Sequence, residues 1–226
     1  MSDTLPVTDP AAGAGASAPG DTLAAVRKRP KPGERREQIL QALAAMLEQP
    51  GAERITTAAL AARLSVSEAA LYRHFASKAQ MFEGLIDFIE HTVFSLVQQI
   101  TGRELPDLAA RRSAEEGARE ASRVVALVLQ FGERNPGMVR VMVGDALVFE
   151  HERLQQRMNQ FFDRIESTLR QCLRPVTAQS GTPTVDAQVA ASVLTAFAVG
   201  RLQRYARSGF RRLPTEHLDA SLARLL

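Results

Sequence analysis

The sequence predicts an all-α protein, because apolar residues recur at helical spacing along the chain and no segment alternates as a half-buried strand would. The 226 residues include no Trp, and aromatic residues make up only 5%. The core must therefore consist of Leu, Val, Ile, Ala and Met, which favours packed helices over a β-sandwich. The hydrophobic share of 45% is typical of a globular protein. The length allows one small module and one larger helical domain.

Residues 1–33 are expected to form a disordered, basic arm. They contain five prolines, four glycines and almost no large apolar side chain, so they offer too little apolar surface for a core. Positions 27–36 hold six basic residues and one acidic residue, which leaves 22 basic and 24 acidic residues elsewhere. A basic arm beside a small helical module fits a DNA-binding protein, and it fits a solubilising linker equally well.

The composition also predicts a cytoplasmic protein without a membrane partner. Cys172 is the only cysteine, so an intrachain disulfide is impossible and a reducing compartment is expected. The N-terminal residues are acidic at Asp3 and Asp9 and lack the basic start and apolar run of a secretory signal. No stretch comes near the roughly 18 apolar residues that a membrane span needs.

Three helices are expected in the first part of the chain. A stripe of Leu and Ile side chains predicts a helix over residues 33–48. A second, short helix is expected to start at Thr56 or Thr57, because threonine is a good N-cap. After a turn at 64–66, a third short helix with a serine N-cap is expected over about 67–75.

Longer helices are predicted for the rest of the chain, with breaks where Gly and Pro cluster. They are expected over about 78–101 and 111–133, from Pro136, over 148–173 and 185–208, with a short helix from Thr215. Small side chains such as Ala191 and Ala198 let the last long helix approach another helix closely. That helix could belong to a second subunit or to the same chain.

Residues 56–75 fit a helix-turn-helix, in which the second, reading helix enters the major groove. We expect Leu64, Leu71 and Phe75 to lock its two helices together. Small residues at the start of the reading helix allow close approach to the bases, while threonine hydroxyls and a lysine at a helix N-terminus suit phosphate. The candidate DNA contacts are Thr56, Thr57, Ser67, Glu68, Ala69, Tyr72, His74 and Lys78. No Arg–guanine or Asn–adenine pair is evident, so no recognition sequence is predicted.

The run RITTAALAARLSVSEAALYRHFASKAQMF, residues 54–82, resembles the DNA-binding module of the TetR family. The most specific part is Leu71 to Phe75, followed by Ser77 and Lys78. The resemblance implies a three-helix DNA-binding domain over 34–79 and a helical dimerisation and partner-binding domain over 80–226. It also implies a homodimer in which the last two long helices form a four-helix bundle with their copies. Such a dimer would present its reading helices to palindromic double-stranded DNA, about 34–36 Å apart.

Three further segments resemble the nucleoid occlusion factors, a group within the TetR family. They are RREQILQALAAMLE (35–48), FGERNPG (131–137) and GDALVFEHERLQQRMNQFFDRIE (144–166), within a similarity that spans roughly residues 34–213. The resemblance implies a nucleoid-associated protein that binds specific DNA sites. When bound to DNA, such a protein inhibits polymerisation of the division protein FtsZ, so that no septum forms over the chromosome.

The resemblance also implies a groove for the FtsZ C-terminal tail between the fourth and fifth helices. The matching residues are Phe88, Leu127, Arg134 and Asn135. Each also has a purely structural interpretation. Phe88 and Leu127 fit apolar helix stripes and would then be core residues, whereas Arg134 and Asn135 would cap the helix that ends before Pro136.

The main alternative function is a ligand-responsive TetR-type repressor, which would hold a small molecule in its C-terminal domain. Five phenylalanines could line such a cavity or could form plain core, and we expect no small-molecule ligand: Phe131, Phe149, Phe161, Phe162 and Phe197. A second alternative is binding of residues 27–36 to anionic lipid, but Pro30 and Pro32 interrupt any amphipathic helix there.

An enzyme is not expected. His74, His91, His151 and His217 are scattered without the spacing of metal ligands, and Cys172 has no evident catalytic partner. The sequence also contains neither a phosphate-binding loop nor a dinucleotide fingerprint. We therefore predict no cofactor and no metal.

Overall fold

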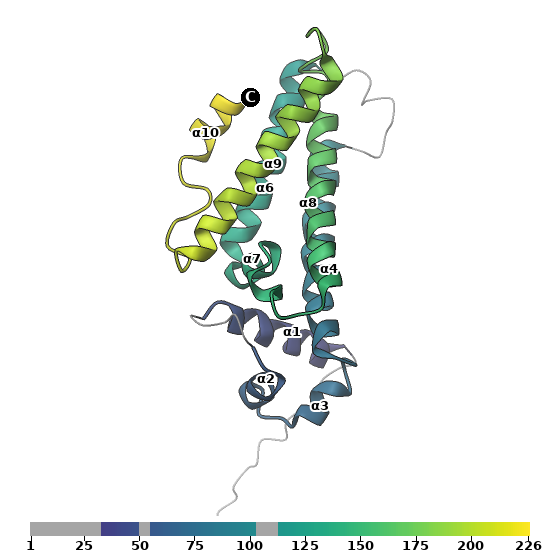
Figure 1. Ribbon diagram of the computed structural model, residues 1–226, viewed down its shortest axis with the longest axis vertical. Coiled ribbons are helices and arrows are strands. Elements are labelled where there is room, and N and C mark those ends of the chain that lie inside the picture. The colour runs from purple at the N-terminus through teal and green to yellow at the C-terminus, as the bar shows by residue number, and fades with distance from the viewer. Residues whose placement is uncertain (1–32, 50–54, 103–112) are drawn as a thin grey trace, which may run out of the picture. The chain divides into compact units, whose positions relative to one another are not determined.

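The computed structural model describes residues 33–49, 55–102 and 113–226 of the chain. Every regular element in these ranges is a helix, which confirms the all-α prediction (Figure 1). The predicted arm lies outside the described residues, except for Gly33. The elements are α1 (Glu34–Leu47), α2 (Thr57–Arg63), α3 (Glu68–Tyr72), α4 (Lys78–Thr101), α6 (Ala114–Arg134), α7 (Pro136–Met142), the 3₁₀ turn η2 (Asp145–Leu147), α8 (Glu152–Leu173), α9 (Pro183–Arg207) and α10 (Leu218–Leu225).

Side-chain caps fix where the first helices begin. Thr56 Oγ1 accepts a hydrogen bond from the backbone N–H of Ala59, and Ser67 Oγ accepts one from that of Ala70. Ser77 caps α4 in the same way, through the N–H of Gln80. Each hydroxyl thereby satisfies a backbone donor that a helix start leaves unpaired. The predicted N-caps at Thr56 and Ser67 are confirmed.

The three short helices share one apolar core. Leu71 and Phe75 are buried as expected, while Leu64 is only partly buried. These three residues pack with apolar side chains of α1 and α2, namely Ile39, Leu43, Leu47, Leu60 and Ala61. Arg36 of α1 adds a cation–π contact, with its guanidinium carbon 4.2 Å from the centre of the Phe75 ring. Helix α1 therefore packs against the buried side of the reading segment.

The longer helices form the C-terminal domain. Figure 1 shows α4, α6, α8 and α9 running alongside one another, and α8 packs against both α9 and α6. Their core is mostly aliphatic, as the composition predicts, with a small aromatic cluster in which Phe161 packs on Phe94 and Phe162. Phe149 lies outside this core with 64% of its surface exposed, so the five phenylalanines do not line a common cavity.

Four predicted helix boundaries were wrong by three or four residues. The helices expected from about residue 111 and from Thr215 begin at Ala114 and Leu218. The helix expected over 148–173 begins only at Glu152, because the chain first makes the 3₁₀ turn η2 and His151 Nδ1 then accepts the N–H of Arg153 as an N-cap. The helix expected over 67–75 ends at Tyr72. Phe75 is buried from the turn that follows this helix, where its N–H still donates to the carbonyl of Leu71.

Helix α7 approaches α1 so closely that only glycine fits at position 137. A Cβ atom added to Gly137 would lie 2.1 Å from the carbonyl oxygen of Ala44. No side chain can occupy that distance, so α7 can pack on α1 only through a residue without a Cβ. This contact sets the spacing between the DNA-binding module and the C-terminal domain.

We expect the substitution Gly137→Ala to lower the free energy of unfolding by about 1–3 kcal/mol, because α7 must move away from the backbone of α1. Urea unfolding followed by circular dichroism measures this change. Gly181→Ala is the control, since Gly181 has no atom within 4 Å of its added Cβ. Equal unfolding midpoints for the two variants would contradict the packing argument.

Candidate DNA-binding surface and partner groove

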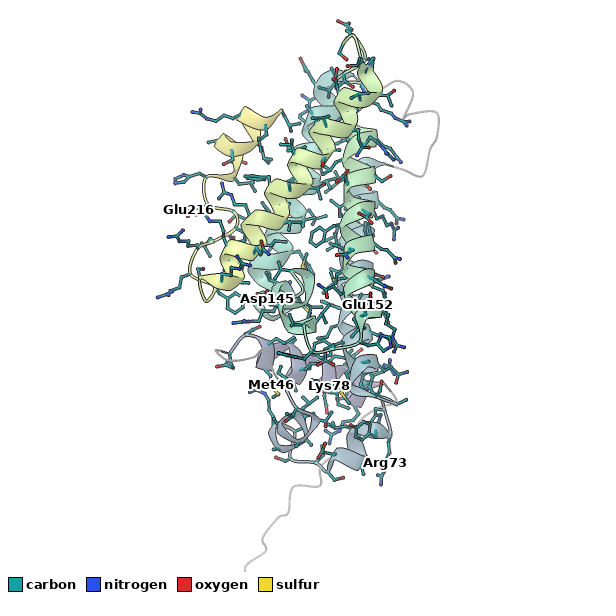
Figure 2. All side chains as sticks on the ribbon, viewed as in Figure 1. Met46, Arg73, Lys78, Asp145, Glu152 and Glu216 are labelled. Atoms are coloured by element: carbon teal, nitrogen blue, oxygen red, sulfur yellow. The ribbon has the colours of Figure 1, made fainter. Side chains whose placement is uncertain are left out.

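The reading helix α3 presents small and polar side chains to solvent. Ser67, Glu68 and Ala69 are exposed at its start, and Tyr72 and His74 are exposed at and beyond its end. These five predicted contacts therefore lie on the accessible surface of the module. Figure 2 shows neighbouring Arg73 at the outer end of the DNA-binding module. The arrangement is suited to insertion into a DNA groove.

Thr57 and Glu68 bind each other. Thr57 Oγ1 donates a hydrogen bond to Glu68 Oε2 at 2.5 Å, which ties the first residue of α2 to the first residue of α3. The two helices of the motif are thereby held at a fixed angle. Both residues were predicted as DNA contacts, and the structure also gives them a role in shaping the motif. Thr56, the residue before Thr57, is exposed.

Arg36 holds the far end of the reading segment. Its guanidinium Nη1 donates to the carbonyl oxygen of His74 at 3.1 Å, in addition to stacking on Phe75. Sequence reasoning missed Arg36, because it assigned the basic residues before and in α1 to the arm. The contact spans 38 positions in the chain, and no periodic pattern signals it. Arg36 is therefore a positioning residue for the predicted DNA surface.

Lys78 is held by an ion pair. It is the first residue of α4, and its Nζ donates a hydrogen bond to Oε1 of Glu150, in the segment between η2 and α8. The carboxylate belongs to a side chain that is only 10% exposed. Lys78, which is predicted to contact a DNA phosphate, is thus already paired with a carboxylate of the same chain.

Three more ion pairs join α4 to α8. Glu83 pairs with Arg153 at 2.9 Å, and Arg157 pairs with Asp87 at 2.9 Å and with Glu90 at 2.6 Å. Burial lowers the pKa of Arg157, but its hydrogen bonds to Glu90 and Asp87 outweigh this and leave the pKa above its usual value. Acidic residues three or four positions apart on one helix face basic residues at similar spacing on the other. The pairs align the two helices.

A groove of about 500 Å³ opens between α1, α4 and the start of α7. Its floor is apolar, and the charged residues in its lining are both acidic. It is lined by Glu37, Leu40, Gln41, Ala44, Ala45, Glu48, Leu85, Phe88, Asn135 and Met138. Two of the four predicted partner-binding residues, Phe88 and Asn135, therefore line one groove, but this groove lies between α1, α4 and α7 and not between the fourth and fifth helices (α4 and α6) as expected.

The predicted partner residues differ in their surroundings. Phe88 is 46% exposed, with its ring 6.3 Å from that of Phe131, so the core interpretation of Phe88 is wrong. Asn135 does cap α6, because its Nδ2 donates to the carbonyl of Phe131 at 2.8 Å. Leu127 is partly buried and Arg134 is exposed, and neither lines the groove.

One face of α9 carries apolar side chains in solvent. Val185, Val189 and Val193 recur every four residues and are all exposed. By length and composition alone, α9 could cross a membrane, contrary to the prediction that no stretch is apolar enough for a span, and a third of its most apolar stretch is buried. Core helices of soluble proteins meet the same criterion, so it is weak evidence for a membrane span. A line of exposed valines on one helix face is a candidate interaction surface.

Comparison with known proteins agrees with this geometry. Residues 39–85 match the family described as bacterial regulatory proteins, tetR family, and residues 119–225 match the tetracyclin repressor-like, C-terminal domain. Among solved structures, the TetR family transcriptional regulator PfmR from Thermus thermophilus aligns with a TM-score of 0.65 at 20% identity. That alignment covers 84% of this chain and 95% of PfmR, and it shows the fold alone.

Curated relatives are considerably more similar in sequence. The nucleoid occlusion factors SlmA of Idiomarina loihiensis and of Photobacterium profundum are each 50% identical to this chain over 187 residues. Each alignment covers 82% of this chain and 90% of the relative. The similarity thus includes both the DNA-binding module and the C-terminal helices. The chain therefore belongs to the SlmA family of nucleoid occlusion factors, within the TetR family of bacterial regulatory proteins.

Proposed function

We propose that this protein is a homodimeric nucleoid occlusion factor, which binds palindromic DNA sites on the chromosome and, when bound, inhibits polymerisation of FtsZ. The observation that carries the proposal is the position of the two candidate sites on one helix. Lys78 at the start of α4 borders the DNA-binding module, and Leu85 and Phe88 of the same helix line the groove. Leu85 and Phe88 lie about 10 Å and about 15 Å from Lys78 along the helix, which rises about 1.5 Å per residue.

The exposed face of α3 supports the DNA half of the proposal. Its contacts would be Thr56, Thr57, Ser67, Glu68, Ala69, Tyr72, His74 and Lys78, in a module over residues 34–79. The caps at Thr56 and Ser67 leave each hydroxyl hydrogen available to donate to a phosphate oxygen, since the oxygen only accepts in the cap. This DNA binding would keep the protein at the nucleoid.

The valine stripe on α9 supports a homodimer built by residues 80–226. An apolar stripe with four-residue spacing fits against a second copy of itself in an isologous interface. A two-fold axis through this interface would also place two reading helices on one palindrome. A second protomer would cover the apolar surface that a lone chain leaves in water.

The apolar groove supports a peptide-binding site between α1 of the DNA-binding module and helices α4 and α7 of the C-terminal part. A groove of this kind fits an extended or helical segment with apolar side chains, and the FtsZ C-terminal tail is our candidate. Phe88 and Asn135 would contact it directly, while Leu127 and Arg134 would act from the neighbouring surface of α6. Because the lining carries Glu37 and Glu48, basic side chains of the partner would be favoured beside them.

The direct test of the proposed function follows FtsZ polymerisation by light scattering and GTP-dependent pelleting. The protein is added without DNA, with random duplex, and with a palindrome selected by the protein itself. We expect filament mass to fall mainly with the selected palindrome. Equal polymerisation in all three conditions would instead indicate a conventional repressor.

We expect Phe88→Ala to weaken inhibition of FtsZ and to leave DNA binding intact, because half of the ring lies open in the groove. An exposed aromatic anchor suggests a loss of about tenfold in affinity for the FtsZ tail, measured by fluorescence anisotropy. Leu96→Ala is the control, since Leu96 is also exposed on α4 but does not line the groove. Equal losses in both variants would count against the assignment.

We expect Val189→Glu to convert the dimer into monomers, because a carboxylate would have to be buried without a partner in the valine interface. Sedimentation velocity at micromolar concentration measures the change. Val148→Glu is the matched control, since Val148 is an equally exposed valine away from α9. A dimeric Val189→Glu protein would show that α9 does not form the interface.

A further inference from the structure

The ion pair between Lys78 and Glu150 links the two candidate functional parts of the chain. Lys78 directly follows the cap Ser77, at the end of the DNA-binding module. Glu150 belongs to the C-terminal part, in the segment that leads from η2 into α8. The two residues are 72 positions apart, and both are at least partly shielded from solvent. Figure 2 shows Lys78 between Arg73 of the module and Glu152 at the start of α8.

A DNA phosphate and the Glu150 carboxylate are alternative partners for the same ammonium group. Lysine offers a compact point charge with three donors, which suits either anion. The N-terminus of α4 also attracts phosphate, since its first backbone N–H groups point outward. Two anions around one ammonium repel each other at short range, so a phosphate that approaches Lys78 weakens its bond to Glu150.

We propose that Glu150 acts as an internal competitor of DNA, and that binding of DNA phosphate to Lys78 releases residues 148–151, which follow the buried turn η2, from α4. This inference rests on the proposed DNA binding and adds a coupling device to it. The other α4–α8 ion pairs, at Glu83, Asp87 and Glu90, lie further along α4 and stay in place. The change is therefore confined to the end of α4 that faces the module.

Release of this segment changes the surface of the C-terminal domain. The segment contains Val148 and Phe149, both 64% exposed, and it leads directly into the N-cap of α8. Ala146 and Leu147 of η2 are buried in the core, whereas residues 148–151 are held by a single turn, in which the N–H of Glu150 donates to the carbonyl of Leu147. Loss of the Lys78–Glu150 ion pair removes this contact between the turn and α4. DNA occupancy is thereby transmitted to a region outside the DNA-binding module.

Binding of the selected palindrome to four variants tests the competition, with dissociation constants measured by fluorescence anisotropy at one salt concentration. We expect Glu150→Gln to bind about two- to fivefold more tightly than the wild type, the range of a partly exposed ion pair. Lys78→Met should bind more weakly, and the double variant should bind like Lys78→Met. Glu83→Gln is the control, because it makes the same charge change and breaks the ion pair to Arg153.

Two results would overturn the competition. In the first, Glu150→Gln binds no more tightly than Glu83→Gln. In the second, the gain from Glu150→Gln persists when Lys78 is already Met. If the wild type binds DNA and Lys78→Met binds equally well, the inference fails while the proposed function stands. If the wild type binds no duplex at all, the proposed function fails, and the inference fails with it.

Amide hydrogen exchange of the wild-type protein tests the release. With the palindrome bound, we expect exchange within 148–151 to become several-fold faster, while exchange in the reading segment 67–75 slows. Unchanged exchange within 148–151 on a protein whose reading segment is protected would overturn the release.

Discussion

The continuity of α4 is the constraint on which the other parts of the structure depend. Its 24 residues rise about 36 Å, from the end of the DNA-binding module to the far part of the helical domain. Helices of this length bend sharply only at defined defects. The one glycine within α4, Gly84, is covered by the Leu40 side chain of α1, 3.0 Å from where its Cβ would be. Helix α4 therefore carries Lys78 beside the DNA-binding module and Leu85 and Phe88 in the groove on one continuous element.

The charged contacts between α4 and α8 set alignment more than stability. Partly exposed ion pairs contribute about 0–1 kcal/mol each, whereas burial of a single leucine contributes about 1.5–3 kcal/mol. The aliphatic core thus holds the helices together, and the pairs select one register between them. Arg157, which binds Asp87 and Glu90 together, fixes that register most firmly. Lys78–Glu150 is the one pair among these that involves a predicted DNA contact, so it is the pair that DNA can alter.

The sequence predicted the helices and their caps well, because periodicity and capping are local properties. These predictions failed where residues of a local pattern contact side chains that are distant in the sequence. Val148 and Phe149 look like the start of an apolar stripe, yet the chain turns there and His151 caps α8. Phe88 fits the stripe of α4, but α1 and α7 leave it at the edge of the groove. The contacts Arg36–His74 and Lys78–Glu150 join residues 38 and 72 positions apart, which no periodicity can reveal.

The hydrogen bond from Thr57 to Glu68 bears on how DNA is chosen. A glutamate at the start of a reading helix could accept a hydrogen bond from the cytosine amine, but here its carboxylate is already engaged within the motif. The remaining exposed residues of α3 include a methyl group and a phenol, and no bidentate amide reader. In the proposed complex with DNA, discrimination among sites would then depend more on groove width and on how easily the duplex deforms. Such a surface would tolerate base changes that preserve the shape of the double helix, so that related but non-identical operators could serve equally well.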